Sequence, residues 1–446
     1  MTVPAADIDH KRKLGPVLAT FLVAGNMIGS GVYLLPVTLG SVGSVSILGW
    51  VVAAGGALLL GAVFSYLALA RPTANGVVAY SGEALGRFFG WEAAFAYWLT
   101  CVVGNIAIGL AAVGYLAHFL PVLKQPIWTA AGTAALIWLF TFANIIGPRL
   151  VGRFHGLALA VGLLPILAAA ILGWFWFDPA VFAASWNVTE PPRSDASAIG
   201  LSLVMVFWAF LGLESASVCA GVVRNPERNV PIATFAGVLL AAVIYIAASA
   251  AVMGVLSAAE LKASTAPFAD VVARVAGPAA AAFVAGCAVL KASGTLGGWI
   301  LVTAETTRAS AESGFFPKWA SRQRADGVPV RDLVVLAVLM TLVAFLTVQP
   351  TIGGQFTVLT NVATNLALAV YALCCLALLR FASALKRGKA AARVAAVLGF
   401  AFSVWSIVAS DPELLQVQGW LFLVSLPLFA LVWWAGRARP SPAPAE

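Results

Sequence analysis

Long apolar stretches, separated by short polar connections, make up most of this sequence. A helix needs about 20 apolar residues to cross the hydrocarbon of a bilayer, and twelve stretches are long enough to do so. They cover residues 14–38, 44–70, 87–119, 127–146, 155–177, 196–222, 230–256, 277–306, 329–349, 355–380, 391–409 and 416–436. Only 10% of the 446 residues are charged, too few to cover a soluble globule. The pattern predicts an all-α integral membrane protein with twelve spanning helices.

The distribution of basic residues predicts the orientation of these helices. Cytoplasmic loops of membrane proteins carry an excess of Lys and Arg. With the N-terminus inside, 21 of the 26 Lys and Arg residues fall on the cytoplasmic side and four in outer loops, while Lys291 lies within a helix. We therefore expect cytoplasmic tails at residues 1–13 and 437–446, the second of them disordered. The net charge of +8 reflects this topology rather than a nucleic-acid partner.

The first predicted helix contains an unusual run of small residues at mid-span, where residues 25–31 read GNMIGSG. Each glycine costs about 1 kcal/mol in a helix interior. Gly25 and Gly29 alone would suit close packing between helices, whereas the cluster Gly29-Ser30-Gly31 favours local unwinding. Backbone N–H groups freed by such a break could bind a carboxylate.

The sixth predicted helix also carries a glycine at mid-span, Gly212, which Glu214 follows closely. Paired interrupted helices in two halves of a chain indicate an inverted-repeat transporter with a site near the membrane midplane. An intramembrane carboxylate costs about 2.5–3.5 kcal/mol on insertion scales. Glu214 is thus either a structural group bonded between helices or a gate or proton carrier, and its place after the break favours the second interpretation.

Lys291 lies near the middle of the eighth predicted helix, too far from either interface for its ammonium to reach water easily. Two interpretations stay open: a counter-ion for a carboxylate such as Glu214, or a built-in cation that replaces a bound Na⁺ or titrates during transport. Thr295 and Trp299 share its helix face, because the three are spaced by four residues. Trp299 and Trp208 lie at mid-span and could pack in the core or stack on an organic cation.

Four stretches carry a resemblance to a known family: GNMIGSGVYLLP, AYWLTCVVGNIAI, WAFLGLESASVCAGVVRNPERNVPIAT and GTLGGW. From about residue 14 to 436 the chain resembles the amino acid–polyamine–organocation (APC) superfamily, and within it the basic amino acid/polyamine antiporters. The resemblance implies a LeuT-like fold with discontinuous helices 1 and 6. Residues 14–380 would form two inverted five-helix repeats, and residues 391–436 two extra helices. It also implies a multi-pass protein of the bacterial inner membrane, often a homodimer.

The resemblance further implies roles for residues at matching positions. Those expected at the substrate are Asn26, Met27, Gly29, Ser30, Gly31, Cys101, Asn105, Trp208, Leu211 and Trp299, with Ile108 in the same wall. Those expected at gates or in proton coupling are Tyr97, Glu214, Phe356 and Tyr371. Lys291 is added to this group because it lies inside the membrane. Two positions depart from the antiporters: Ala363 replaces a serine, with Thr364 beside it, and Lys291 replaces a small residue. A charge at Lys291 could repel a dicationic amine, or it could lie deeper and leave the pocket untouched.

These features together predict a secondary active amino acid transporter that works by alternating access. The first hypothesis is an exchanger of the arginine/agmatine type. The alternative is a proton-coupled symporter of neutral or basic amino acids that uses Lys291 or Glu214. An enzyme is disfavoured because no His, Asp or Cys cluster lies at a membrane face; a receptor or scaffold stays open. We expect no cofactor, metal or nucleic acid, and as partners an amino acid or its decarboxylated amine and the lipid bilayer.

Overall fold

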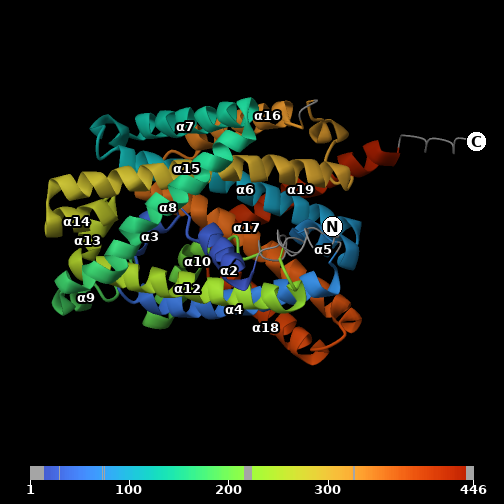
Figure 1. The fold of residues 1–446 in the computed structure, drawn as a ribbon, viewed down its shortest axis with the longest axis horizontal. Coiled ribbons are helices and arrows are strands. Elements are labelled where there is room, and N and C mark those ends of the chain that lie inside the picture. Colours follow the sequence, from blue (N-terminus) through green and yellow to red (C-terminus); the bar gives the residue numbers. More distant parts are fainter. Residues whose placement is uncertain are drawn as a thin grey trace, which may run out of the picture.

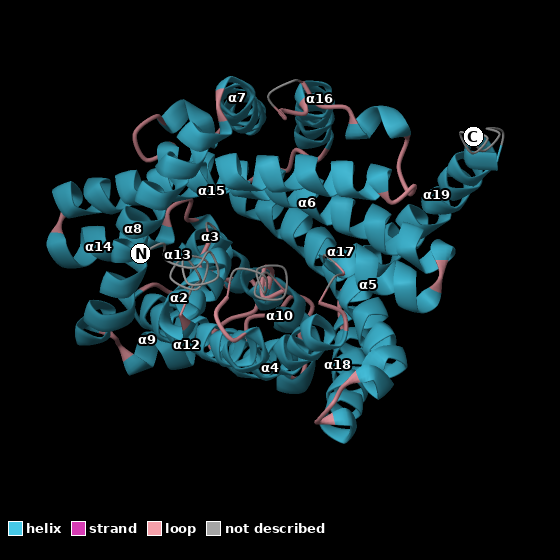
Figure 2. Cartoon of the chain, turned by 45° about the vertical axis from the view of Figure 1, so that its right-hand side comes forward, coloured by secondary structure: helices cyan, strands magenta, loops and turns pink. Residues whose placement is uncertain are grey.

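The computed structural model describes residues 15–29, 31–72, 74, 76–214, 223–324 and 327–437. Within these ranges the regular elements are all helices, and no strand forms (Figure 2). Nine helices in the described part are long and apolar enough to cross a membrane. The predicted all-helical membrane architecture is therefore confirmed, whereas the count of twelve spans and the inverted repeat stay predictions.

The long helices follow the predicted spans to within a few residues at most ends. They are α4 (Ser46–Ala70), α6 (Arg87–Leu116), α7 (Pro126–Ile146), α8 (Pro148–Leu172), α12 (Pro226–Val255), α15 (Pro278–Glu312), α16 (Val330–Leu346), α17 (Ile352–Phe381), α18 (Lys389–Val408) and α19 (Pro412–Arg437). Proline opens α7, α8, α12, α15 and α19, because its fixed φ suits the first helical position and its missing N–H is not needed there. Shorter helices lie in the connections: α5 (Gly76–Leu85), α9 (Pro179–Ala184), α13 (Ala258–Ala263) and α14 (Pro267–Ala276).

The first and sixth predicted spans are not continuous helices. The first is divided into α2 (Pro16–Met27) and α3 (Gly31–Leu39), with Ile28 and Gly29 outside both helices. The sixth begins as α10 (Asp195–Phe207), tightens into the 3₁₀ turn η3 (Trp208–Phe210) and continues as a non-helical turn over residues 211–214. Gly212 in this turn has φ +98°, a conformation that glycine adopts without steric cost.

The interrupted helices lie inside a ring of long ones. Figure 2 shows α2, α3 and α10 in the middle of the molecule, with α4 and α12 on one side and α6, α15 and α17 on the other. The helix α6 packs against both α15 and α17, and α15 also packs against α8 (Figure 1). The broken ends therefore face the centre of the bundle.

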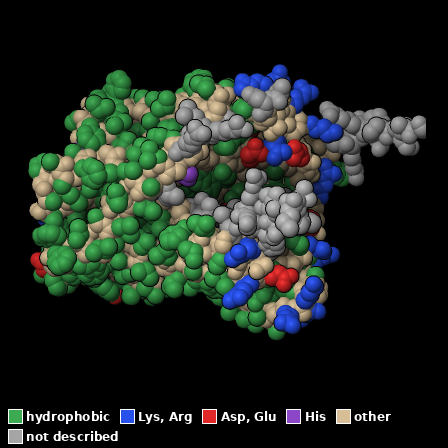
Figure 3. Space-filling view, viewed as in Figure 1, with side chains coloured by type: hydrophobic (Ala, Val, Ile, Leu, Met, Phe, Trp, Pro, Cys, Tyr) green, Lys and Arg blue, Asp and Glu red, His purple; other side chains and the backbone are tan. Residues whose placement is uncertain are grey.

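Charge is concentrated at one end of the molecule. In the face shown in Figure 3, hydrophobic side chains cover most of the surface, and Lys and Arg gather at the end near the C-terminus. An apolar belt with one basic end is the surface expected of a protein that lies in a membrane. The side that this end faces stays a prediction.

Candidate functional site

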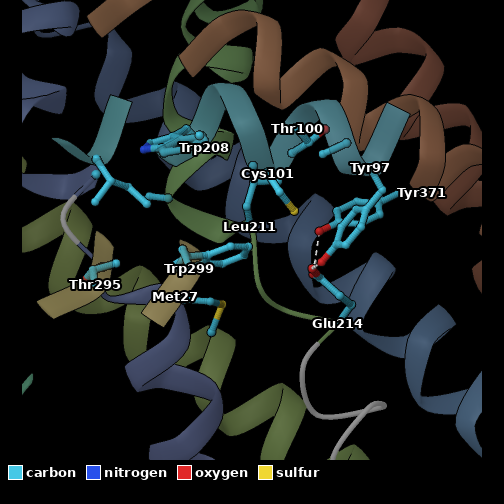
Figure 4. Close-up of a pocket in the computed structure, with 16 residues that line it drawn as sticks. Met27, Tyr97, Thr100, Cys101, Trp208, Leu211, Glu214, Thr295, Trp299 and Tyr371 are labelled. Carbon is cyan, nitrogen blue, oxygen red and sulfur yellow. Dashed lines mark hydrogen bonds between the residues drawn. The ribbon is translucent and has the colours of Figure 1, made fainter. Parts of the chain in front are cut away.

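A cavity lies where the interrupted helices meet α6, α15 and α17 (Figure 4). The volume of this cavity that is open to water is about 50 Å³, room for a few water molecules in the described arrangement. The lining residues are Met27, Gly29, Gly31, Tyr97, Thr100, Cys101, Gly104, Ile108, Trp208, Ala209, Leu211, Glu214, Thr295, Trp299, Ala367 and Tyr371. Most of the predicted substrate and gate residues thus surround one space, although their roles stay predictions.

Helical periodicity explains which side chains of the long helices reach the cavity. Residues three or four apart lie on one helix face. The helix α15 contributes Thr295 and Trp299, and α17 contributes Ala367 and Tyr371, each a pair four residues apart. The helix α6 contributes a longer row on one face: Tyr97, Thr100, Cys101, Gly104 and Ile108. Thr100 and Gly104 were not predicted from the sequence, although extending the predicted residues of α6 by this spacing could have identified both.

Glu214 lies in the cavity lining and is bonded to two other helices. The hydroxyl of Tyr97 donates to its Oε1 at 2.8 Å and that of Tyr371 to its Oε2 at 2.6 Å. The backbone N–H of Gly212 also donates to Oε2, at 3.1 Å. The residue is only 5% exposed, so these bonds replace the water that its carboxyl group has lost. They tie the break after α10 to both α6 and α17 (Figure 4).

Trp208 fills the space that two glycines leave open. A Cβ atom at Gly31 would overlap the indole Nε1, and one at Gly104 would lie 3.2 Å from the far edge of the ring. The hydroxyl of Tyr245 donates to the carbonyl of Ala209 at 3.2 Å, which supports the backbone where α10 has ended. The glycines of α3 and α6 therefore let a large aromatic ring sit against the broken helix.

Asn105 lies behind the cavity wall rather than in it. Its amide nitrogen donates to the hydroxyl of Thr303 at 2.8 Å and to the carbonyl of Trp299 at 3.4 Å. The residue joins α6 to α15 next to the backbone of Trp299, whose ring lies beside Leu211 and Met27 in Figure 4. In this arrangement Asn105 can position Trp299 but does not line the space available to a substrate.

Two other predicted residues also lie away from the lining. Phe356, in the first turns of α17, is completely buried. Lys291 is buried one turn before Thr295 on α15, and its Nζ has no hydrogen-bond partner among the described residues. Lys291 therefore forms no ion pair with Glu214, which is bonded to the tyrosines of α6 and α17. The predicted residue Ser30 and the side chain of Asn26 lie outside the described part of the chain.

Known proteins similar to this chain are membrane transporters. A family model described as amino acid permease matches residues 14–435. A cadaverine/lysine antiporter of Escherichia coli (strain K12) is 38% identical over 375 residues, which are 83% of this chain and 84% of the antiporter. The putrescine transporter PotE of the same strain is 33% identical over 423 residues, 94% of this chain and 96% of its own length. The putrescine transporter PotE of Haemophilus influenzae is 32% identical over 423 residues, again 94% of this chain.

Proposed function

The chain belongs to the amino acid permease family, and from this premise we propose that it exchanges a cationic amino acid for its decarboxylated amine by alternating access. One observation supports the cationic substrate above all. The described lining contains two tryptophans, two tyrosines and the carboxyl group of Glu214, but no Lys or Arg. Aromatic faces and a carboxylate attract an organic cation.

The substrate would lie between the two broken helices. Gly29 lines the cavity without a side chain, and a Cβ atom there would meet no atom closer than 3.6 Å. The ring of Trp208 occupies the space beside Gly31, whereas the backbone on the Gly29 side of the break in the first span is open to a small ligand. We propose that the substrate carboxylate binds there, as anions bind at the ends of half-helices. The cationic end would then lie against the ring of Trp299.

The proposed substrate pair is arginine and agmatine, with lysine and cadaverine as the second candidate. A planar guanidinium stacks on an aromatic ring better than an ammonium does, which supports the first pair. The second pair is supported by the cadaverine/lysine antiporter, at 38% identity. Proton symport is a third possibility, which is supported by Lys291, a buried lysine with no hydrogen-bond partner in the described part of the chain.

Transport into proteoliposomes tests these proposals. Purified protein would be reconstituted, and uptake of labelled arginine or lysine measured into vesicles that are empty or preloaded with arginine, agmatine, lysine or cadaverine. Exchange requires that preloading accelerate uptake, and the most effective pair identifies the substrates. If preloading has no effect while an imposed proton gradient drives uptake, the exchanger proposal fails in favour of symport.

A further inference from the structure

The connection between α17 and α18 carries a dense group of positive charges. Lys386, Arg387, Lys389 and Arg393 follow the 3₁₀ turn η6 (Ala382–Ala384) and lead into the first turns of α18. All four residues are exposed. In Figure 3, Lys and Arg gather at the lower right of the molecule, in the part of the view where Figure 1 places α18. These four residues are called the basic corner below.

No carboxylate in the described part of the chain compensates these charges. The sequence has no Asp or Glu between Asp332 and Asp411, and none of the four basic residues forms an ion pair with a described residue. The helix α4, which packs against α18, contains no acidic residue. Glu83 of α5, which packs against α17, lies 4.0 Å from Arg71 and pairs with that residue instead.

The orientation of the helices does not by itself explain a basic surface without acids. Lys and Arg set the orientation of membrane helices, and Asp and Glu contribute little to it, so acidic neighbours could be present at no cost to topology. The end of α15 shows such neighbours: Arg308 pairs with Glu305 at 2.7 Å and with Glu312 at 2.6 Å. The basic corner therefore differs from this helix end in having its charge free for an external anion.

The basic corner lies where the lipid-facing surface of α18 begins. Val394, Val397 and Leu398 are 57%, 54% and 48% exposed, and an exposed apolar surface of this kind belongs in the hydrocarbon of the bilayer. These residues start directly after Arg393, so the charges of the corner lie at the level of the lipid headgroups. Lys389 and Arg393 are four residues apart and share one face of α18.

We propose that the basic corner binds the headgroup of an anionic phospholipid. Ammonium and guanidinium groups bind phosphate through charge-assisted hydrogen bonds, and clusters of four or more Lys and Arg beside a membrane helix recognise anionic lipids. The chain's own terminal segments are not complementary to the corner. Residues 1–14 contain two Asp against three Lys and Arg, and residues 438–446 one Glu against one Arg, so neither brings net negative charge on its side chains. The inference does not depend on the proposed substrates.

Equilibrium binding of a fluorescent phosphatidylglycerol to purified full-length protein in a neutral detergent tests the proposal. The same probe with a phosphatidylcholine headgroup is the reference, because the ratio of the two affinities cancels the contribution of the acyl chains. One Lys or Arg near an anionic headgroup changes affinity about fivefold. We therefore expect the wild type to prefer phosphatidylglycerol at least about tenfold, and the preference to weaken as added KCl screens the charges.

Matched variants assign this preference to the basic corner. Replacing all four of its residues with glutamine should reduce the preference to less than about threefold, whereas Lys386→Arg with Lys389→Arg keeps the charge and should keep the preference. The control is Lys318→Gln with Arg322→Gln, which removes two exposed charges at and beside the 3₁₀ turn η5 (Lys318–Ser321). This control should bind both probes as the wild type does.

Thermal unfolding in the detergent alone shows whether each variant is folded. If the fourfold variant is not, Lys386→Gln with Arg387→Gln and Lys389→Gln with Arg393→Gln are tested as separate pairs, each with an expected loss of preference of at least about fivefold. A preference that persists in folded variants of the corner, or that the control loses equally, overturns the proposal. Displacement of the probe by inorganic phosphate at the concentration of the lipid would also overturn it, in favour of a site for free phosphate.

Discussion

Glu214 accepts hydrogen bonds from side chains of two different helices. Variants of Glu214 and of one donor can therefore separate the effect of its charge on substrate binding from the effect of the bonds that join the helices. Glu214→Gln preserves the shape but removes the charge. Hydrogen bonds to charged groups contribute about 1.5–3 kcal/mol, so we expect affinity for arginine or lysine to fall at least about tenfold. Equilibrium binding of the labelled amino acid measures this.

Tyr371→Phe supplies the control for this prediction. It deletes the donor to Oε2 and leaves the carboxyl group in place. If both changes act through one bond, the loss of binding free energy in the double variant should be smaller than the sum of the losses in the two single variants, because residues in contact do not act additively. Strictly additive effects would contradict a shared gate.

Trp299 is the residue expected to stack on the cationic end of the substrate. Trp299→Leu keeps an apolar side chain but removes the ring. A desolvated cation–π contact contributes about 2 kcal/mol, so we expect roughly a 30-fold loss of affinity with little change in thermal unfolding. Trp420→Leu, at an outward position that is 68% exposed, should bind as the wild type does. Unchanged binding in Trp299→Leu would place the cation elsewhere.

Helical spacing in the sequence predicted which face of a helix is turned toward the cavity. It did not predict which side chains on that face enter the cavity. Cys101 and Asn105 are four residues apart on α6, yet Cys101 lines the cavity while Asn105 bonds to Thr303. The hydroxyl that Asn105 contacts belongs to α15 and lies 198 residues away in the chain. Spacing along one helix contains no information about such a partner.

At the scale of elements, Gly31 combines two tasks: it begins α3 and accommodates the ring of Trp208. Gly31→Ala would place a Cβ against the indole. Overpacking of this kind destabilises a protein by about 1–3 kcal/mol, so we expect weaker substrate binding and a lower unfolding temperature. Gly286→Ala on α15, where a Cβ would meet no atom within 4 Å, is the matched control. The interpretation fails if the two alanine variants behave alike.

The short helix α13 is held by charges outside the membrane-spanning helices. Glu260 completes a capping box with Ser257 and pairs with Arg274 at 2.5 Å. The backbone N–H of Ser257, followed by Arg274, lowers the pKa of Glu260 to about 2. Because the folded pKa is below the unfolded one, this stabilisation is complete above about pH 4.5 and is lost as pH falls toward 2. Exposed pairs contribute at most about 1 kcal/mol.

Hydrogen exchange over residues 257–276 tests this assignment. Glu260→Gln should raise exchange in α13 and α14 at neutral pH, and the difference from the wild type should shrink toward acidic pH as the wild-type carboxylate is protonated. A difference that is independent of pH down to about 2 would show that the charge of Glu260 has no part in it.

The two interrupted helices could be predicted from the sequence because glycines inside an apolar span, a cluster in the first and Gly212 in the sixth, weaken the helix at that point. The short helices α5, α13 and α14 could not be predicted in this way. They lie in connections and contain only 10, 6 and 10 residues, so a search for apolar stretches of membrane-spanning length passes over them. The helix α13 has a capping box, whereas α5 and α14 pack against the long helices α6 and α15.

For the whole molecule, the interruptions also explain why twelve apolar stretches correspond to fewer long helices in the described part of the chain. The apolar pattern continues through a break, but each piece is short: α2 has 12 residues and α10 has 13. At 1.5 Å per residue neither piece crosses a hydrocarbon core of about 30 Å. The 17 residues of α16 are also fewer than a straight span needs. Hydropathy thus predicts spans, and the breaks decide which spans remain single helices.

The basic end of the molecule predicts the orientation of the whole bundle. Positive residues remain on the cytoplasmic side because they translocate poorly, so this end and both termini should face the cytoplasm. In intact spheroplasts, an affinity tag after residue 446 should resist an added protease and become sensitive once the inner membrane is permeabilised. A tag inserted in the connection between α9 and α10 lies at the opposite predicted side and should be cleaved before permeabilisation. The reverse pattern would invert this orientation, and Glu214, which follows α10 (Asp195–Phe207) and so lies in the cytoplasmic half of the predicted arrangement, would lie in the outer half instead.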